Sequence, residues 1–463
     1  MKHIRKYIFG MVLLSVQVLW AQEQNTFTLQ QAIEYGLEHN FEIKNAQTDV
    51  NIAKKKVVET RAIGLPHINA SVGYDYFVDI PTQLMPDFIT PNLIRVNQQF
   101  FGLQPVVPIS GEQRMMEMRF GRPHNLTAGI SATQLIFNGS YLVGLRAAST
   151  YVNFARVSLE KKKKEIKHKI AKAYYPVIIL QENLALMDSM LVNMQEMLDE
   201  TKALQEEGFM EDTDVDQLNI VLNDLKTSRK NLQNKWDISS KNLKFLMGMP
   251  IETPVYLTED LENIVNDVAS VSLEASKYDY GKHQDYQLLQ VSKSLALLDI
   301  KNKKAALLPV LSAYYNYQEK AMRDEFDFFD SEQDWFPTQI VGAKLQIPIF
   351  QSWQTRAQIQ QKKLALEKVK VREEQLKQAL QLKYESAKSN LAYSIDVFYN
   401  KELKVKQAER VYRRTKVKFQ TGTASSFELT QAFNQYLQAQ MEYLNAMMDL
   451  LVSKENYELE TGE

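Results

Sequence analysis

The 463-residue sequence contains no cysteine. That absence excludes disulfides, thiolate zinc sites, catalytic thiols and a lipid carried on an N-terminal cysteine. Glycine and proline are scarce, at 16 and 13 residues, and 45% of the residues are hydrophobic, so the chain is neither collagen-like nor disordered. The 55 basic residues nearly balance the 56 acidic ones, which leaves no electrostatic footprint for nucleic acid.

The longest apolar run lies at the N-terminus, where Lys2, Arg5 and Lys6 precede it. This pattern is typical of a secretory signal peptide, and we expect residues 1–21 to be removed by cleavage after Ala21. The mature protein is therefore expected to be exported. No later run reaches the roughly 18 consecutive apolar residues of a spanning helix, which argues against a helical inner-membrane protein. The alternating strands of a membrane β-barrel would escape this test.

The sequence contains an internal duplication. Matching residues recur in the same order in both halves: Pro66 with Pro309, Ala70 with Ala313, Phe137 with Phe350, Gly208 with Gly422, Gln217 with Gln431, Ser239 with Ser453, and Gly248 with Gly462. We therefore expect a first structural repeat at residues 22–249, an acidic connector at 250–271 and a second repeat at 272–463.

Each repeat changes between strand and helix periodicity. Segments with apolar residues at every second position predict four strands, near residues 67–78, 125–137, 310–319 and 338–350. Segments with helical or heptad spacing predict four long helices, at 141–207, 212–247, 351–420 and 425–460. The heptads imply left-handed supercoiling against neighbouring helices. The expected fold class is thus mainly α with membrane β-strands.

Three local features carry expectations of their own. The insertion at 81–123 holds six of the thirteen prolines and is expected to be a loop, extracellular by topology. Pro176 should kink or interrupt the helix at 141–207. Arg229 occupies a core slot of the heptad seam in the helix at 212–247.

The number of strands has a consequence for assembly. A membrane β-barrel needs at least about eight strands, because an open edge in hydrocarbon leaves backbone groups without hydrogen bonds. Four strands cannot close such a barrel. If they enter a membrane, several copies of the chain must pool their strands.

The ordered motifs of this sequence resemble the outer-membrane efflux protein family, the TolC-like channels. The motifs are Thr28-Leu29, the junction Leu65-Pro66, Leu-Ile-Phe-Asn-Gly at 135–139, Ile-Pro-Ile-Phe-Gln at 347–351 and Phe-Gln-Thr-Gly at 419–422. The resemblance implies a homotrimer whose twelve strands form one outer-membrane barrel in a Gram-negative bacterium, continued by a coiled-coil helical tube across the periplasm. It also implies tripartite efflux or type I secretion, in which the channel docks on a periplasmic adaptor (membrane fusion) protein and an inner-membrane pump.

The resemblance places function at the turns between the long helices, where the periplasmic gate and adaptor contacts of the family lie. The corresponding residues here are Gly208, Asp212, Asp214, Gln217, Phe419, Gly422, Ser425, Glu428 and Gln431. In the family the second turn carries acidic residues that ring the pore, and Glu428 keeps that charge while Gln431 does not. Ser425 and Glu428 also have the spacing of a capping box, so helix capping alone is the alternative role for Glu428.

The sequence shows no convincing catalytic site. The six histidines are scattered, and we find no phosphate-binding glycine loop or nucleophile elbow. We therefore expect no enzyme activity, no cofactor and no metal site. Two other classes stay open: a soluble periplasmic coiled-coil adaptor or scaffold, which would not need one-faced strands, and an exported enzyme with an unrecognised site.

Overall fold

The computed structural model describes residues 26–87, 89–102, 115–269 and 278–462, so the expected signal peptide lies outside the described residues. The chain forms two compact units. The first combines the chain up to Lys56 with Ala147–Leu298 and the chain from Gln361 onward, and the second combines Val57–Arg146 with Asp299–Gln360.

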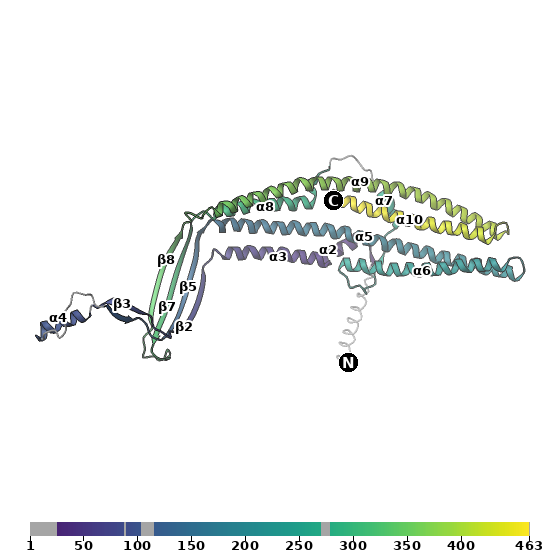
Figure 1. The fold of residues 1–463 in the computed structure, drawn as a ribbon. Coiled ribbons are helices and arrows are strands. Elements are labelled where there is room, and N and C mark those ends of the chain that lie inside the picture. Colours follow the sequence, from purple (N-terminus) through teal and green to yellow (C-terminus); the bar gives the residue numbers. More distant parts are fainter. Residues whose placement is uncertain (1–25, 88, 103–114, 270–277, 463) are drawn as a thin grey trace, which may run out of the picture. The chain divides into compact units, whose positions relative to one another are not determined.

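Helices and strands alternate along both repeats (Figure 1). The helices are α2 (Leu29–His39), α3 (Phe41–Ala62), α4 (Ile89–Phe101), α5 (Gly139–Glu206), α6 (Asp212–Met247), α7 (Leu261–Ala269), α8 (Gln284–Ala305), α9 (Gln354–Gln420) and α10 (Ser426–Thr461), with a 3-10 turn at Tyr280–Lys282. The strands are β1 (Thr26–Phe27), β2 (His67–Tyr76), β3 (Thr82–Pro86), β4 (Met115–Arg119), β5 (His124–Asn138), β6 (Tyr256–Leu257), β7 (Val310–Arg323) and β8 (Phe336–Gln346).

The second unit is built on a four-stranded antiparallel sheet in the order β2-β5-β7-β8. The pairing register aligns the apolar positions of all four strands on one face, as in the row Ile68, Ala132, Tyr315 and Val341. Ile68 and Val341 are 72% and 79% exposed in the single chain. The sheet therefore presents an uncovered apolar face and two open edges, β2 and β8.

The insertion at 81–123 differs from the loop that we predicted. Its described part contains an antiparallel pair, β3 with β4, and the helix α4. We predicted a loop because the insertion is rich in proline. Pro86, however, stands at the end of a short strand, where a proline does not interrupt the pairing. The alternating exposure of β4 follows the pattern of its sequence, Met-Met-Glu-Met-Arg.

The first unit contains two long helical hairpins, α5 with α6 and α9 with α10 (Figure 1). Of the predicted kink or interruption at Pro176, the interruption is wrong, because α5 runs through this proline for 68 residues. Tyr175, Val177 and Ile178 around this proline are each at most 2% exposed. Their burial stabilises the helical path against the lost backbone hydrogen bond.

Two apolar clusters hold the first unit together. The larger one joins α2, α3, α5 and α7 with parts of α6, α9 and α10, around residues such as Ile170, Tyr174 and Leu450. The prediction that Arg229 lies in a helical core is wrong. Its side chain is 39% exposed and pairs with Asp188 of α5, with Nε 2.9 Å from Oδ1, because a long charged side chain reaches water from the rim of a seam.

Among the described residues, α5 is the one helix that is long and apolar enough to cross a membrane by composition. Its most apolar 18-residue window has a mean hydropathy of 1.2, and 39% of that window is buried. The core helix of a soluble protein passes the same test, and α5 contributes many side chains to the larger cluster.

Candidate functional site at the helical tips

The two hairpin turns have the same backbone structure. In the first, Gly208 has a φ of 81°, the Phe209 amide donates to the Leu204 carbonyl at 2.9 Å, and the Gly208 amide donates to Gln205. These two hydrogen bonds form a Schellman motif, which favours glycine at the left-handed position. The second turn repeats it with Gly422, whose φ is 70°. The duplication seen in the sequence thus extends to hydrogen bonding.

The helices that follow the turns begin with matching caps. Ser425 caps α10: its hydroxyl accepts from the Glu428 amide at 3.2 Å, and its own amide donates to the Glu428 carboxylate at 3.0 Å. At the start of α6, Glu211 and Asp214 form the equivalent capping box, and the Asp212 carboxylate accepts from Gln205. These carboxylates lie where a helix N-terminus favours negative charge.

The tip residues predicted from the family resemblance have different environments. Phe419 is only 3% exposed and belongs to the second apolar cluster, so this side chain packs inside the tip. Glu428 and Gln431 are exposed. Gln217 lies on α6 and lines a cleft with residues of α10.

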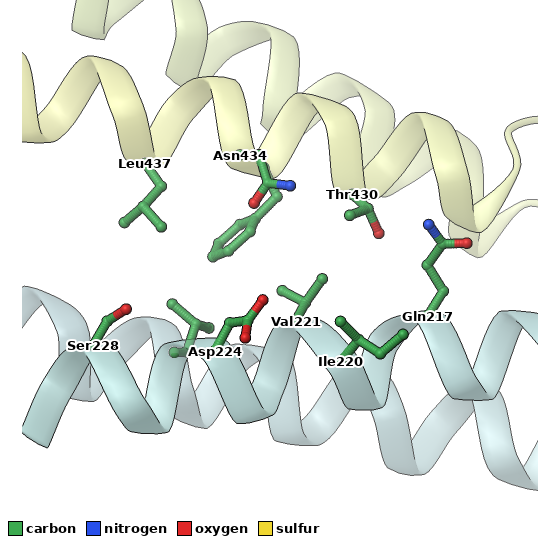
Figure 2. Close-up of a pocket in the computed structure, with 10 residues that line it drawn as sticks. Gln217, Ile220, Val221, Asp224, Ser228, Thr430, Asn434 and Leu437 are labelled. Atoms are coloured by element: carbon green, nitrogen blue, oxygen red, sulfur yellow. The ribbon is translucent and has the colours of Figure 1, made fainter.

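This tip cleft, between α6 and α10, encloses about 120 Å³. Its lining residues are Gln217, Ile220, Val221, Asp224, Leu225, Ser228, Thr430, Phe433, Asn434 and Leu437. Figure 2 shows side chains of the two helices facing each other across it, with Val221 and Leu437 among polar residues such as Asp224 and Asn434. The cleft therefore combines apolar side chains with hydrogen-bonding groups.

The two tips differ in charge. Residues 205–216, around the first turn, contain six acidic residues and no basic one. The end of α9, before the second turn, carries Arg413, Arg414, Lys416 and Lys418. The acidic first turn and the basic end of α9 thus give the two hairpin ends opposite charge.

A stripe of methionines supports the tip, and our sequence analysis missed it. Met187, Met190, Met194 and Met197 are each at most 6% exposed and pack with Leu218, Phe419 and Phe433 from the other three helices of the hairpins. Their spacing of three and four residues could have revealed a helix face. Unbranched methionine side chains adapt to shifts between helices, so this core tolerates small movements of the tip.

Away from the tips, the structure brings together a buried polar cluster. The Glu455 carboxylate of α10 accepts from the Tyr175 hydroxyl and lies beside His168 Nδ1, both at 2.7 Å, and all three residues are at most 2% exposed. Burial alone would raise the pKa of Glu455, but the hydrogen bonds from His168 and Tyr175 and the charge of Lys454 outweigh it and lower the pKa. Burial and the nearby carboxylate raise the pKa of Tyr175 strongly.

This cluster also contains ligand atoms of the kind that bind metals. Atoms of His168, Glu455 and Glu458 lie within 4.8 Å of one another. However, the Lys454 ammonium is 2.9 Å from Glu458 and 3.5 Å from Glu455. The positive charge that balances these carboxylates therefore comes from the chain itself.

The comparisons with known proteins identify the second repeat. Residues 283–458 match the family model for the outer membrane efflux protein. These residues form an outer membrane efflux protein domain. No curated protein sequence matches the chain.

Solved outer-membrane channels share the fold of the whole chain. The chain is 14% identical to CusC with a TM-score of 0.69, covering 94% of this chain and 92% of that one. The outer membrane protein VceC from Vibrio cholerae gives 14% identity, a TM-score of 0.64 and coverages of 94% and 96%. The open state of the MtrE channel from Neisseria gonorrhoeae is 14% identical to the chain, with a TM-score of 0.66, and the match covers 94% of this chain and 88% of that one. The shared fold thus extends beyond the efflux protein domain and includes the first repeat.

Proposed function

We propose that this chain is the outer-membrane channel of a tripartite efflux or type I secretion system and acts as a homotrimer. The observation that carries the proposal is the sheet of the second unit, which has one apolar face and two open edges. Three copies would join β8 of one chain to β2 of the next, which gives twelve strands and removes every edge. The helices of the first unit then form the periplasmic tunnel. A soluble adaptor or scaffold would not expose such a face.

A pair of lysine substitutions on β8 tests the lipid-facing side of the sheet. Val341→Lys puts a charge on the apolar face, where it costs about 2–4 kcal/mol near the membrane midplane. Thr338→Lys, three residues away on the opposite face, is the control. We expect Val341→Lys to reduce the amount of trimer in outer-membrane fractions and Thr338→Lys to leave it unchanged. The wild-type trimer should conduct ions in planar bilayers, and a purified wild-type protein that stays a water-soluble monomer contradicts the proposal.

We further propose that the tip cleft receives a helical hairpin of a periplasmic adaptor. Ile220 is 62% exposed at the cleft, so an arginine there places a charge against the incoming helix. Ile238, five helical turns along α6 on the same face and 69% exposed, is the control. Ile220→Arg should weaken binding of the cognate periplasmic adaptor at least tenfold in calorimetry, and Ile238→Arg should not. Loss of the trimer in Ile220→Arg would instead identify a contact between subunits.

For Glu428, we propose that three copies of its carboxylate ring the pore and favour cations. Glu428→Gln separates this role from capping, because glutamine also completes a capping box. The substitution should lower cation selectivity in bilayer recordings while the helix start keeps its amide protection. Unchanged selectivity would leave Glu428 with the capping role alone.

A further inference from the structure

The helix α4, inside the insertion between β2 and β5, exposes a continuous apolar stripe. The α4 stripe consists of Ile89, Leu93, Val96 and Phe100, which are 40%, 58%, 45% and 73% exposed. Their spacing of four, three and four residues places all four on one side of the helix, as the d and a positions of a heptad seam do. A seam of this kind normally packs against other helices, and no helix among the described residues covers it.

The β3–β4 ribbon that flanks α4 also exposes apolar side chains. In the chain, α4 lies between β3 and β4, and in Figure 1 it lies beyond β3, whose antiparallel pair with β4 has five residues in each strand. An isolated two-stranded ribbon is marginally stable in water. Leu84 and Met115 on this ribbon are 60% and 55% exposed. The described part of the insertion therefore exposes apolar side chains of the kind that are covered in an assembly.

The charge pattern of α4 favours a second copy of the same helix over a lipid surface. Arg95 is the single charged residue between Ile89 and Phe101, and it lies away from the stripe. Helices that lie on anionic membranes carry several Lys or Arg residues on their polar face. The positions that flank the seam hold neutral residues such as Asn92 and Gln99, so identical helices can pack in parallel without repulsion between like charges.

We propose that the α4 helices of three copies of this chain pack through the α4 stripe into a short parallel three-helix bundle. This inference rests on the proposed trimer. A helix of 13 residues is too short to associate strongly on its own. The trimer strengthens this weak association, because helices tethered to one barrel meet at an effective concentration in the millimolar range.

The position of the bundle gives it a role. β2 ends and β5 begins at the paired residues Tyr76 and His124, so the insertion leaves the sheet at the end opposite to α3 and α5. Three such insertions surround one mouth of the proposed barrel. Joined on the threefold axis, they form a cap across that mouth, and cargo passes between their stalks or after the bundle separates.

Disulfide trapping tests the bundle directly, because the chain has no cysteine and a single introduced thiol is unique. Val96→Cys places three thiols at the centre of the bundle, and Phe100→Cys places them a half-heptad step further along. Arg95→Cys, next to Val96 but outside the stripe, is the control. We expect mild oxidation of the full trimer to produce disulfide-linked dimers in Val96→Cys and Phe100→Cys at least tenfold faster than in Arg95→Cys.

The mass of each variant in detergent, measured before oxidation, separates two kinds of failure. Monomers of the wild-type protein would overturn the trimer and the bundle together. A trimer in which both stripe variants react freely with maleimide yet link no faster than Arg95→Cys would overturn the bundle alone. Labelled Val96→Cys that is quenched by nitroxide lipids in liposomes would also overturn it, because the stripe would then lie on the membrane.

Discussion

Replacing Glu455 by alanine should strongly weaken the packing of α10 on α5. The carboxylate is 2% exposed and is the acceptor for the Tyr175 hydroxyl and the partner of His168 Nδ1. The other nitrogen of this imidazole, Nε2, is buried without a partner among the described residues, so the ring has no alternative bond in place. Glu455→Ala leaves two buried donors unpaired at about 1–3 kcal/mol each, or roughly 2–6 kcal/mol together.

Amide hydrogen exchange measures this loss where it occurs, because the proposed trimer would not unfold in a reversible two-state transition. We expect amides of residues 166–179 to exchange at least about 30-fold faster in Glu455→Ala, since about 1.4 kcal/mol corresponds to a factor of ten. Glu455→Gln keeps one acceptor oxygen and should lie between wild type and alanine. Glu458→Ala is the control, because its pair with Lys454 is partly solvated and worth about 1 kcal/mol or less.

Equal protection in Glu455→Ala and Glu458→Ala would refute the reasoning. The pH dependence provides a second check. Because the pKa of Glu455 is lowered in the folded protein, its stabilising contribution is present above its usual pKa of 4.5 and is lost as the pH falls through the lowered value. The difference in exchange rate between wild type and Glu455→Ala should therefore shrink below about pH 4.5.

Further predictions concern the tips and the α9–α10 hairpin. Hydrogen bonds from Lys401 and Lys404, both at 2.8 Å, lower the pKa of Glu442 to about 2, so Glu442→Gln should remove a stabilisation that wild type keeps above pH 4.5 and loses toward pH 2. The Glu442 side chain is 26% exposed, so we expect Glu442→Gln to lower local stability by about 1 kcal/mol, measured by hydrogen exchange. A loss of stability that does not depend on pH would contradict the lowered pKa of Glu442. Gly422→Ala should cost about 1–2 kcal/mol in local exchange because φ is 70°, although a Cβ has open space there. Ser425→Ala should cost about 0.5–2 kcal/mol at the start of α10 with unchanged ion selectivity.

The sequence pattern was a good guide to local features, whose structure depends on residues that are close along the chain. The structure forms the capping box of Ser425 and Glu428, and the repeated glycines Gly208 and Gly422 both occupy left-handed turns. These features depend on hydrogen bonds within a few residues, so one sequence contains all the information that they need.

Contacts between distant segments were beyond such reasoning. Neither His168 nor Glu455 stands out in the sequence, because they are 287 positions apart and meet only when α10 packs on α5. Pro176 was predicted to kink or interrupt a helix, and α5 is not interrupted there because Tyr175 and Val177 beside the proline are buried. The tip cleft was equally invisible, since it depends on the separation between α6 and α10 rather than on either helix alone.

The unpaired borders of the sheet have a consequence for cells that carry two versions of this gene. On the proposed assembly, each ring needs an intact β2 and β8 from all three members. Expressing equal amounts of a normal chain and one with a damaged border would leave only about one ring in eight wholly normal, because each place is filled independently. A single faulty allele should therefore behave as dominant, and its severity should rise steeply with its share of the total protein.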